Sequence, residues 1–479
     1  MAKVLLVHYI GATAHSRSVV ASVARDQINA GNSVTIADLS DYTVISQDFV
    51  PPAVAKLLGH KVYRGKFDSE MATLGVEVRS LTARHHRGEK LPEAIQQECS
   101  QAVESELLTY FRTEKLDFSR RYLTWLHAQL SAASIDTYFA LSSLLEREEP
   151  DLVLIPNGRT SRQKVTRKLT ERRNIPFKFY EMGRARRDAY YLGTTQPHDR
   201  IASQEEIDPL TSTLSQQEIV SLADDMLAER MSLGSSINTF SKKWVEQADT
   251  ASSTNESKPL AVFFTSSTDE FLSFGPMWNI DSWSEQFEAF DLMIPDLERR
   301  GARCVIRVHP NLLDKSHRYV SKTIRSVKEL SRRHPELEVI WHTSPVSSYD
   351  LVRSSTYVIT EHSTIGMEAS MMGKPVWVTE AAQWNHVADV KQILSPADFT
   401  QSTMDLWDVD PSGAKKFAAY WMMQEHPLSY TWKDWSSWNP TKPPFRLKAA
   451  ILLGKNPLRH KLHLLALEWD RLRNSRISN

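Results

Sequence analysis

Short apolar runs alternate with helical patterns in the first half of the chain. Val4–Val7 is an apolar run, Ser16–Ala30 has a helical pattern ended by a glycine, and Ser33–Ala37 is a second apolar run. Further on, Asp151–Pro156 and Phe177–Tyr180 have the length and composition of buried strands. Strands alternating with helices predict a parallel sheet with helical crossovers.

The same alternation returns after a polar stretch without periodicity at 247–258, which we interpret as a linker. Leu260–Phe264 begins a series of predicted strands and helices that runs through Arg303–Val308 and Thr364–Met372. The pattern is typical of a doubly wound α/β domain. We therefore predict an N-terminal domain at 1–246, a linker at 247–258, a C-terminal domain at 259–410, and a Trp-rich, basic helical extension at 411–479.

Composition narrows the class of protein. The 479 residues include 58 Lys plus Arg and 58 Asp plus Glu, so the formal net charge is zero. A dedicated nucleic-acid binder usually carries a basic excess, which argues against that class. The two cysteines, Cys99 and Cys304, form no close pair. We therefore expect no zinc site or disulfide framework, and a cytoplasmic location.

No apolar stretch approaches the roughly 20 residues that span a bilayer, and the first apolar run is too short for a signal peptide. Neither half contains G-x-G-x-x-G or G-x-x-x-x-G-K-[ST], so ordinary dinucleotide and P-loop sites lose their main support. Other devices for binding phosphate remain.

The first such device is the segment Glu361–Ala369, which follows a predicted strand. Ser363 or Thr364 would cap the next helix, and the start of a helix is a ready site for an anion. A simple helix cap without a ligand explains the same residues. His362 and Glu368 belong to this segment and are counted as donor-binding candidates.

Two further strand ends carry polar residues. Arg307, His309 and Pro310 close one strand, and Ser266 and Ser267 follow another. Ligands of open α/β sheets bind at the carboxyl ends of strands, so these side chains are candidates for contacts with a phosphate or ribose. A surface histidine and a polar turn are the alternative interpretations.

The N-terminal half offers Asn157 and Arg159 after one strand, and Glu181 and Arg184 after the next. Glu181 could deprotonate an acceptor hydroxyl. A salt bridge to a neighbouring arginine is an equally good explanation of this carboxylate.

Together, the segments FFTSSTDEF, VIRVHPN and TEHSTIGMEASMMGKPV resemble the donor-binding half of bacterial capsular-polysaccharide glycosyltransferases. That group includes transferases for 3-deoxy-manno-octulosonic acid (Kdo) and is distantly related to bacterial sialyltransferases. IPNGR and YEMG resemble segments of the same group. The resemblance covers about residues 150–400. Met182 departs from it, because the sialyltransferase motif has a second acidic residue there.

The resemblance implies a GT-B-like α/β fold, with two Rossmann-like domains and a cleft between them. It also implies catalysis without a metal or cofactor. Glu181 matches the general base, His309 the histidine at the donor phosphate, and Ser363 with Thr364 the phosphate-binding hydroxyls. The implied activity is an inverting transfer from a nucleotide-activated sugar, with a CMP-linked acidic sugar favoured. The acceptor would be a growing surface polysaccharide or glycolipid.

Three alternatives stay open. The same fold could support a nucleotide-sugar epimerase, a glycerol-phosphate transferase, or a non-catalytic carbohydrate-binding protein. The C-terminal tail also has two interpretations, because its basic residues are interleaved with leucines: it either touches anionic lipid or packs on its own protein. These residues are Lys448, Lys455, Arg459, Lys461, Arg471, Arg473 and Arg476.

Overall fold

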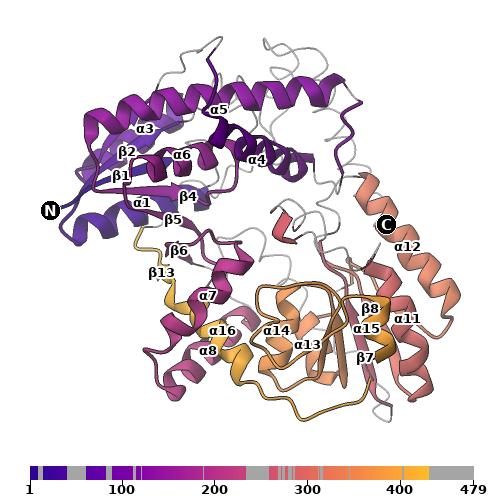
Figure 1. The fold of residues 1–479 in the computed structure, drawn as a ribbon. Coiled ribbons are helices and arrows are strands. Elements are labelled where there is room, and N and C mark those ends of the chain that lie inside the picture. The colour runs from indigo at the N-terminus through magenta and orange to yellow at the C-terminus, as the bar shows by residue number, and fades with distance from the viewer. Residues whose placement is uncertain are drawn as a thin grey trace. The chain divides into compact units, whose positions relative to one another are not determined.

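The computed structural model describes residues 1–8, 14–39, 61–81, 89–111, 115–119, 121–186, 188–232, 258–267, 271, 274, 276–278, 283, 286–310, 312, 317–344, 346–401 and 404–430. The chain divides into two compact units, and each has its own sheet (Figure 1). Unit 1 comprises residues 1–184, 188–197 and, of the final stretch, 425–430; unit 2 comprises 198–424 with 185–187. The predicted architecture of two α/β units is therefore confirmed.

The sheet of unit 1 has the strand order β13-β6-β5-β4-β1-β2-β3. The strands from β5 to β3 are parallel, and β6 and β13 extend the sheet with antiparallel pairs. The strands are β1 (Lys3–His8), β2 (Ser33–Asp38), β3 (Glu77–Ser80), β4 (Leu152–Pro156), β5 (Phe177–Met182), β6 (Ala189–Gly193) and β13 (Glu425–Pro427). The helices are α1 (Ala14–Asn29), α3 (Lys61–Thr73), α4 (Glu93–Phe111), α5 (Arg121–Glu148) and α6 (Ser161–Arg172).

The sheet of unit 2 is parallel throughout, with the order β12-β11-β10-β7-β8-β9. Its strands are β7 (Leu260–Phe264), β8 (Arg303–Arg307), β9 (Glu338–Ile340), β10 (Tyr357–Thr360), β11 (Val376–Val378) and β12 (Lys391–Gln392). Its helices are α7 (Arg200–Thr211), α8 (Gln216–Met231), α11 (Gln286–Arg299), α12 (His317–Arg333), α13 (Ser348–Ser354), α14 (Thr364–Met371), α15 (Pro396–Gln401) and α16 (Ser412–Met423), with a 3₁₀ turn at Pro276–Trp278.

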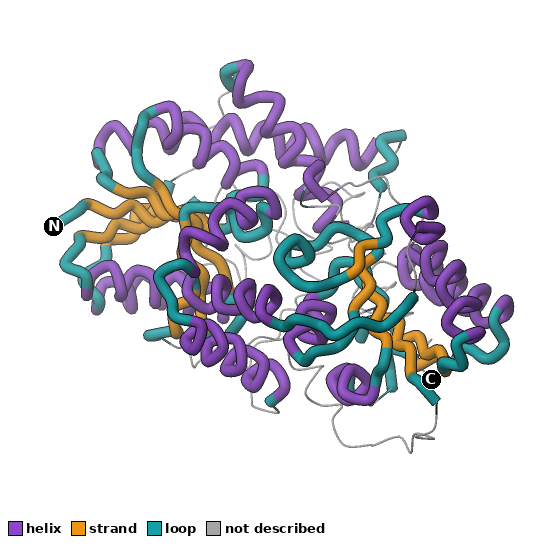
Figure 2. The backbone as a smooth tube through the Cα atoms, turned by 60° about the horizontal axis from the view of Figure 1, so that its bottom comes forward, coloured by secondary structure: helices purple, strands orange, loops and turns teal. Residues whose placement is uncertain are grey.

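The central strands β1, β7 and β10 are buried on both faces, which explains why they are apolar without alternation. In β7, Val262 packs into one core of unit 2 and Phe263 into the other. In β1, Leu6 and Leu5 divide in the same way between the two cores of unit 1. Figure 1 shows α11 and α12 on one side of the unit 2 sheet and α13 and α14 on the other. Figure 2 shows the strands of each unit gathered together with helices around them.

The predicted domain boundary at 246 is wrong. Helices α7 and α8 belong to unit 2, where Ile207 and Met226 share a core with Phe417 of α16. Lys415 of α16 also donates to Asp224 of α8 over 2.9 Å. The apolar faces of α7 and α8 are visible in the sequence, but their packing partner α16 is not. The linker predicted at 247–258 lies outside the described residues, apart from its last position.

The predicted extension at 411–479 is also corrected where the structure describes it. Helix α16 lies in the core of unit 2, and β13 pairs with β6 in unit 1. The basic segment from Lys448 onward lies outside the described residues. Among the described helices, none is long and apolar enough to cross a membrane.

Candidate functional site

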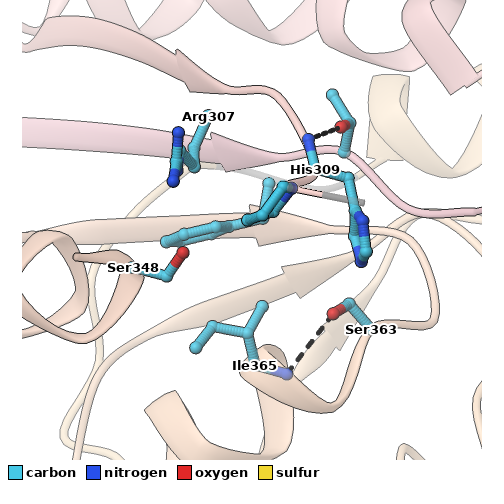
Figure 3. Close-up of a pocket in the computed structure, with 8 residues that line it drawn as sticks. Arg307, His309, Ser348, Ser363 and Ile365 are labelled. Carbon is cyan, nitrogen blue, oxygen red and sulfur yellow. Dashed lines mark hydrogen bonds between the residues drawn. The ribbon is translucent and has the colours of Figure 1, made fainter. Parts of the chain in front are cut away.

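A pocket opens in unit 2 where β7 and β8 end and α14 begins (Figure 3). The pocket is open to solvent. The lining residues are Phe264, Thr265, Arg307, His309, Pro310, Ser348, Ser363 and Ile365.

The position of His309 follows from the pairing of β7 with β8. The two strands are in register to their ends, where Phe264 lies opposite Arg307. Beyond this pair, the backbone N–H of His309 donates to the hydroxyl of Thr265 over 2.9 Å. The backbone of His309 is thus fixed, and Figure 3 shows its imidazole pointing toward the side of the pocket where Ser363 lies.

The opposite side of the pocket is the start of α14. Ser363 is the N-cap residue, with an extended backbone at φ −65° and ψ 141°. Its hydroxyl oxygen accepts from the N–H of Ile365 at 3.5 Å, and its carbonyl accepts from Gly366 at 3.1 Å. The first turn of a helix presents N–H groups and a partial positive charge. Ile365, in that turn, lines the pocket, so this helix start faces the space.

Arg307 adds a full positive charge to the pocket. Its side chain is 2% exposed. The guanidinium donates to the carbonyls of Trp341 at 2.6 Å and Ser344 at 3.5 Å, which fix it against the loop after β9. Burial lowers the pKa of Arg307 to about 10, so the group stays cationic at neutral pH. A buried cation beside a helix start favours an anion in the pocket.

Four of the predicted site residues therefore meet at one pocket: the catalytic candidate His309 and the donor-binding candidates Arg307, Pro310 and Ser363. Four lining residues were not proposed as site residues: the apolar Phe264 and Ile365, and the hydroxylic Thr265 and Ser348. A hydroxyl directly after a strand was the available signal for Thr265. Ser348 had no such signal, because it opens the short helix α13 and reaches the pocket only through the fold.

The other predicted donor residues lie around the pocket without lining it. Ser266 and Ser267 are buried, and the Ser266 N–H donates to Gln286. His362 is also buried, with its ring centroid 3.5 Å from that of Phe271. Thr364 and Glu368 both contact Arg230, a residue that the sequence did not single out.

In unit 1, Glu181 and Asn157 meet at the ends of β5 and β4. The Asn157 side-chain amide donates to one Glu181 oxygen over 2.6 Å, and the Met182 N–H donates to the other over 2.9 Å. Asn157 has a left-handed backbone with φ 53°, which asparagine tolerates better than most residues. The salt bridge that we weighed as an alternative for Glu181 is not among the contacts of the described residues, where an amide holds this carboxylate instead.

The two predicted acceptor-side arginines have structural contacts. The Arg159 N–H donates to Gln163 at the start of α6. The Arg184 guanidinium donates to the Pro197 carbonyl and lies 4.9 Å from the centroid of the Tyr191 ring. The start of α6 is occupied by the buried carboxylate of Glu106, which accepts from Ser161 and Arg162. An anionic acceptor group would have to displace this carboxylate to bind there.

In the described part of the chain, no group of three or more His, Cys, Asp or Glu side chains is arranged to hold an ion. The fold and the site together define an α/β protein of two sheet units, with a pocket at the strand ends of the second.

Comparison with solved structures finds matches at low identity and low TM-score. A putative UDP-N-acetylglucosamine 2-epimerase from Listeria monocytogenes is 12% identical and has a TM-score of 0.33, over 87% of this chain and 90% of that one. The KpsC beta Kdo 2,4 transferase of Thermosulfurimonas dismutans is 14% identical with a TM-score of 0.34, over 57% and 79%. UDP-GlcNAc 2-epimerase from Neisseria meningitidis, bound to UDP-GlcNAc, is 14% identical with a TM-score of 0.33, over 87% and 94%. No protein-family model and no curated protein matches the sequence.

Proposed function

We propose that this protein is a glycosyltransferase that binds a nucleotide-activated sugar through the pocket of unit 2 and transfers the sugar to a hydroxyl group. One observation carries the proposal. Arg307, His309 and the N-cap Ser363 line the same pocket at the start of α14. These groups suit a phosphate that gains negative charge as it leaves, because they are fixed before the reaction begins.

The chemistry is a direct displacement at the anomeric carbon. The acceptor oxygen forms the new bond to that carbon as the bond to the donor phosphate breaks. The electron pair of the broken bond goes to the phosphate, where Arg307, His309 and the helix N–H groups stabilise it. The phosphate end of the donor would bind at this solvent-open pocket, while the base and sugar extend beyond it.

Glu181 is proposed as the general base that takes the acceptor proton. Its carboxylate is oriented by the Asn157 amide and the Met182 N–H. Both contacts leave each oxygen with further lone pairs for a substrate hydroxyl. The resemblance of YEMG to the glycosyltransferase group supports the same assignment.

The resemblance of the sequence favours a CMP-linked acidic sugar as donor and a surface polysaccharide or glycolipid as acceptor. It also implies a reaction without a metal or cofactor. If so, a chelator such as EDTA should leave the turnover of the purified enzyme unchanged. A fall in turnover that added Mg²⁺ or Mn²⁺ restores would contradict this part of the proposal.

Two measurements test the function itself. A thermal-shift screen against CMP, CDP, UDP and GDP should raise the apparent melting temperature for one base, because a ligand that binds only the folded state stabilises it. Product analysis with the matching nucleotide sugar should then show release of the nucleotide that depends on an acceptor. Conversion of the nucleotide sugar without any acceptor would indicate an epimerase, and binding without nucleotide release would indicate a non-catalytic protein.

A further inference from the structure

One arginine from α8 reaches the start of α14. Arg230 Nη1 donates to the hydroxyl of Thr364 over 3.3 Å and forms an ion pair with Glu368. Thr364 and Glu368 are four residues apart, so they lie on one face of the helix. The guanidinium carbon also lies 5.9 Å from the centroid of the Trp421 ring in α16. A single side chain thus ties three helices of unit 2 together.

The charge of Glu368 explains why this contact matters for a ligand. The Glu368 side chain is 2% exposed, and it lies one turn beyond the N-cap residue Ser363, which lines the pocket. A buried carboxylate is costly without a counter-charge. It would also oppose an anion at the same helix start, because like charges repel. Arg230 supplies the counter-charge.

The contact with Thr364 has a second consequence. Arginine has no acceptor atom, so the Thr364 oxygen must accept from Arg230. The hydroxyl hydrogen of Thr364 is then directed to another acceptor. Arg230 therefore balances the charge of Glu368 and orients the hydroxyl hydrogen of Thr364 in the first turn of α14. Arg230 does not itself line the pocket.

We propose that Arg230 is a positioning residue for the phosphate group of the donor. Arg230 neutralises the charge of Glu368, so that the start of α14 can bind an anion. The ion pair also holds the Glu368 side chain on the helix, so that Glu368 does not contact the donor directly. This inference rests on the proposed function, since it concerns the same pocket. Its alternative is a merely structural tie between α8 and α14, which would affect charged and uncharged ligands alike.

The test compares a nucleotide with its own nucleoside. The probe is whichever of CMP, CDP, UDP and GDP stabilises the wild type, together with the matching nucleoside, and affinities are measured by titration calorimetry or ligand-observed NMR. Arg230→Met should weaken nucleotide binding on the order of tenfold, as expected for one unpaired charge near the site. Nucleoside binding should change less than about twofold.

The opposite variant makes the prediction sharper. Glu368→Gln removes the negative charge and keeps the positive charge of Arg230, so nucleotide affinity should rise by about threefold or more. The double variant, in which both charges are removed, should return close to wild type. Arg230→Lys keeps the charge and should retain most of the affinity. Arg299→Met, at an exposed ion pair with Asp296 on α11, is the matched control and should change nothing.

The outcomes separate the two proposals. If the wild type binds none of the four nucleotides, the proposed function fails before any variant is made, and this inference fails with it. If the wild type binds, equal losses of nucleotide and nucleoside in Arg230→Met would overturn the inference alone. A loss of nucleotide affinity in Glu368→Gln would overturn it as well, because Glu368 would then contact the donor. Should Arg230→Met not fold, Glu368→Gln and the double variant decide the question.

Discussion

The backbone N–H of His309 donates a hydrogen bond of 2.9 Å to the side-chain hydroxyl of Thr265. This bond joins the chain just after β8 to the chain just after β7, one step beyond the last paired residues of the two strands. It fixes where His309 stands without involving the imidazole. The imidazole of His309 can therefore be removed while the hydrogen bond that fixes the backbone remains.

His309→Ala should separate chemistry from folding. We expect turnover to fall about 100-fold, the size typical of losing one group that stabilises developing charge. Stability should change by less than about 0.5 kcal/mol, because the side chain is half-buried and its backbone bond is kept. Steady-state kinetics and thermal unfolding measure the two effects. Thr265→Val, which removes the acceptor of the backbone bond, should lower both, and an unchanged turnover in His309→Ala would refute the role of the ring.

Glu181→Gln should abolish most of the turnover and leave nucleotide binding within about twofold, since a general base acts on the acceptor proton and contributes about 10²–10⁴-fold. Single-turnover kinetics and calorimetry with the nucleotide check the two parts. Asn157→Gly is the companion variant, because glycine accepts the left-handed backbone at φ 53° while removing the amide. It should reduce turnover less than Glu181→Gln. Normal turnover in Glu181→Gln would exclude this residue as the base.

Gly366→Ala should destabilise unit 2. A methyl group at this position would lie 2.6 Å from the ring of Trp384 and 2.7 Å from Cγ2 of Thr360. Alanine is the better helix former by about 1 kcal/mol, but Trp384 is buried and cannot withdraw without displacing its neighbours. We expect a net loss of about 1–3 kcal/mol, measured by denaturant unfolding. A variant as stable as the wild type would show that the ring has room to shift.

His8 should make stability depend on pH. Burial, assisted by the charge of Arg17, lowers the pKa of His8 to about 3, against 6.5 in the unfolded chain. Below pH 6.5, His8 binds a proton in the unfolded chain but not in the folded state. This contribution to stability is therefore complete above pH 6.5 and is lost as the pH falls toward 3, by at most about 1.4 kcal/mol per pH unit.

His8→Phe removes the titrating group and keeps a ring that can pack against Phe67, whose centroid is 5.8 Å away. Unfolding curves between pH 7 and 4 should be less steep in pH for this variant than for the wild type. Identical pH dependence in the two proteins would show that other groups cause the acid sensitivity.

The sequence predicts the described strands that lie in the middle of each sheet, because they are buried on both faces and therefore read as short apolar runs. Leu260–Phe264 was predicted with the bounds that β7 has in the structure, and Ser33–Ala37 misses only the last residue of β2. Strand β6, by contrast, was not predicted. Its residues Ala189–Gly193 follow a cluster of arginines, and their strand character depends on pairing with β5.

The candidate site could be predicted only where it follows directly from a strand end. His309 and Ser363 each stand just after a strand, and parallel strands bring their carboxyl ends to one edge of a sheet. Ser348 and Arg230 reach the site from α13 and α8, so their place depends on how helices pack. Helix α8 was assigned to the wrong domain for the same reason, because its pattern shows an apolar face but not the element against which that face packs.

Strand β13 has a consequence for the synthesis of the chain. The ribosome completes β6 early, but its antiparallel partner at Glu425–Pro427 emerges only after the described part of unit 2. Until then, β6 is an open edge on which a neighbouring nascent chain could dock. A stop codon just before Glu425 would preserve every residue of the pocket, but it would leave the edge of β6 uncovered permanently. We expect the truncated chain to aggregate during expression.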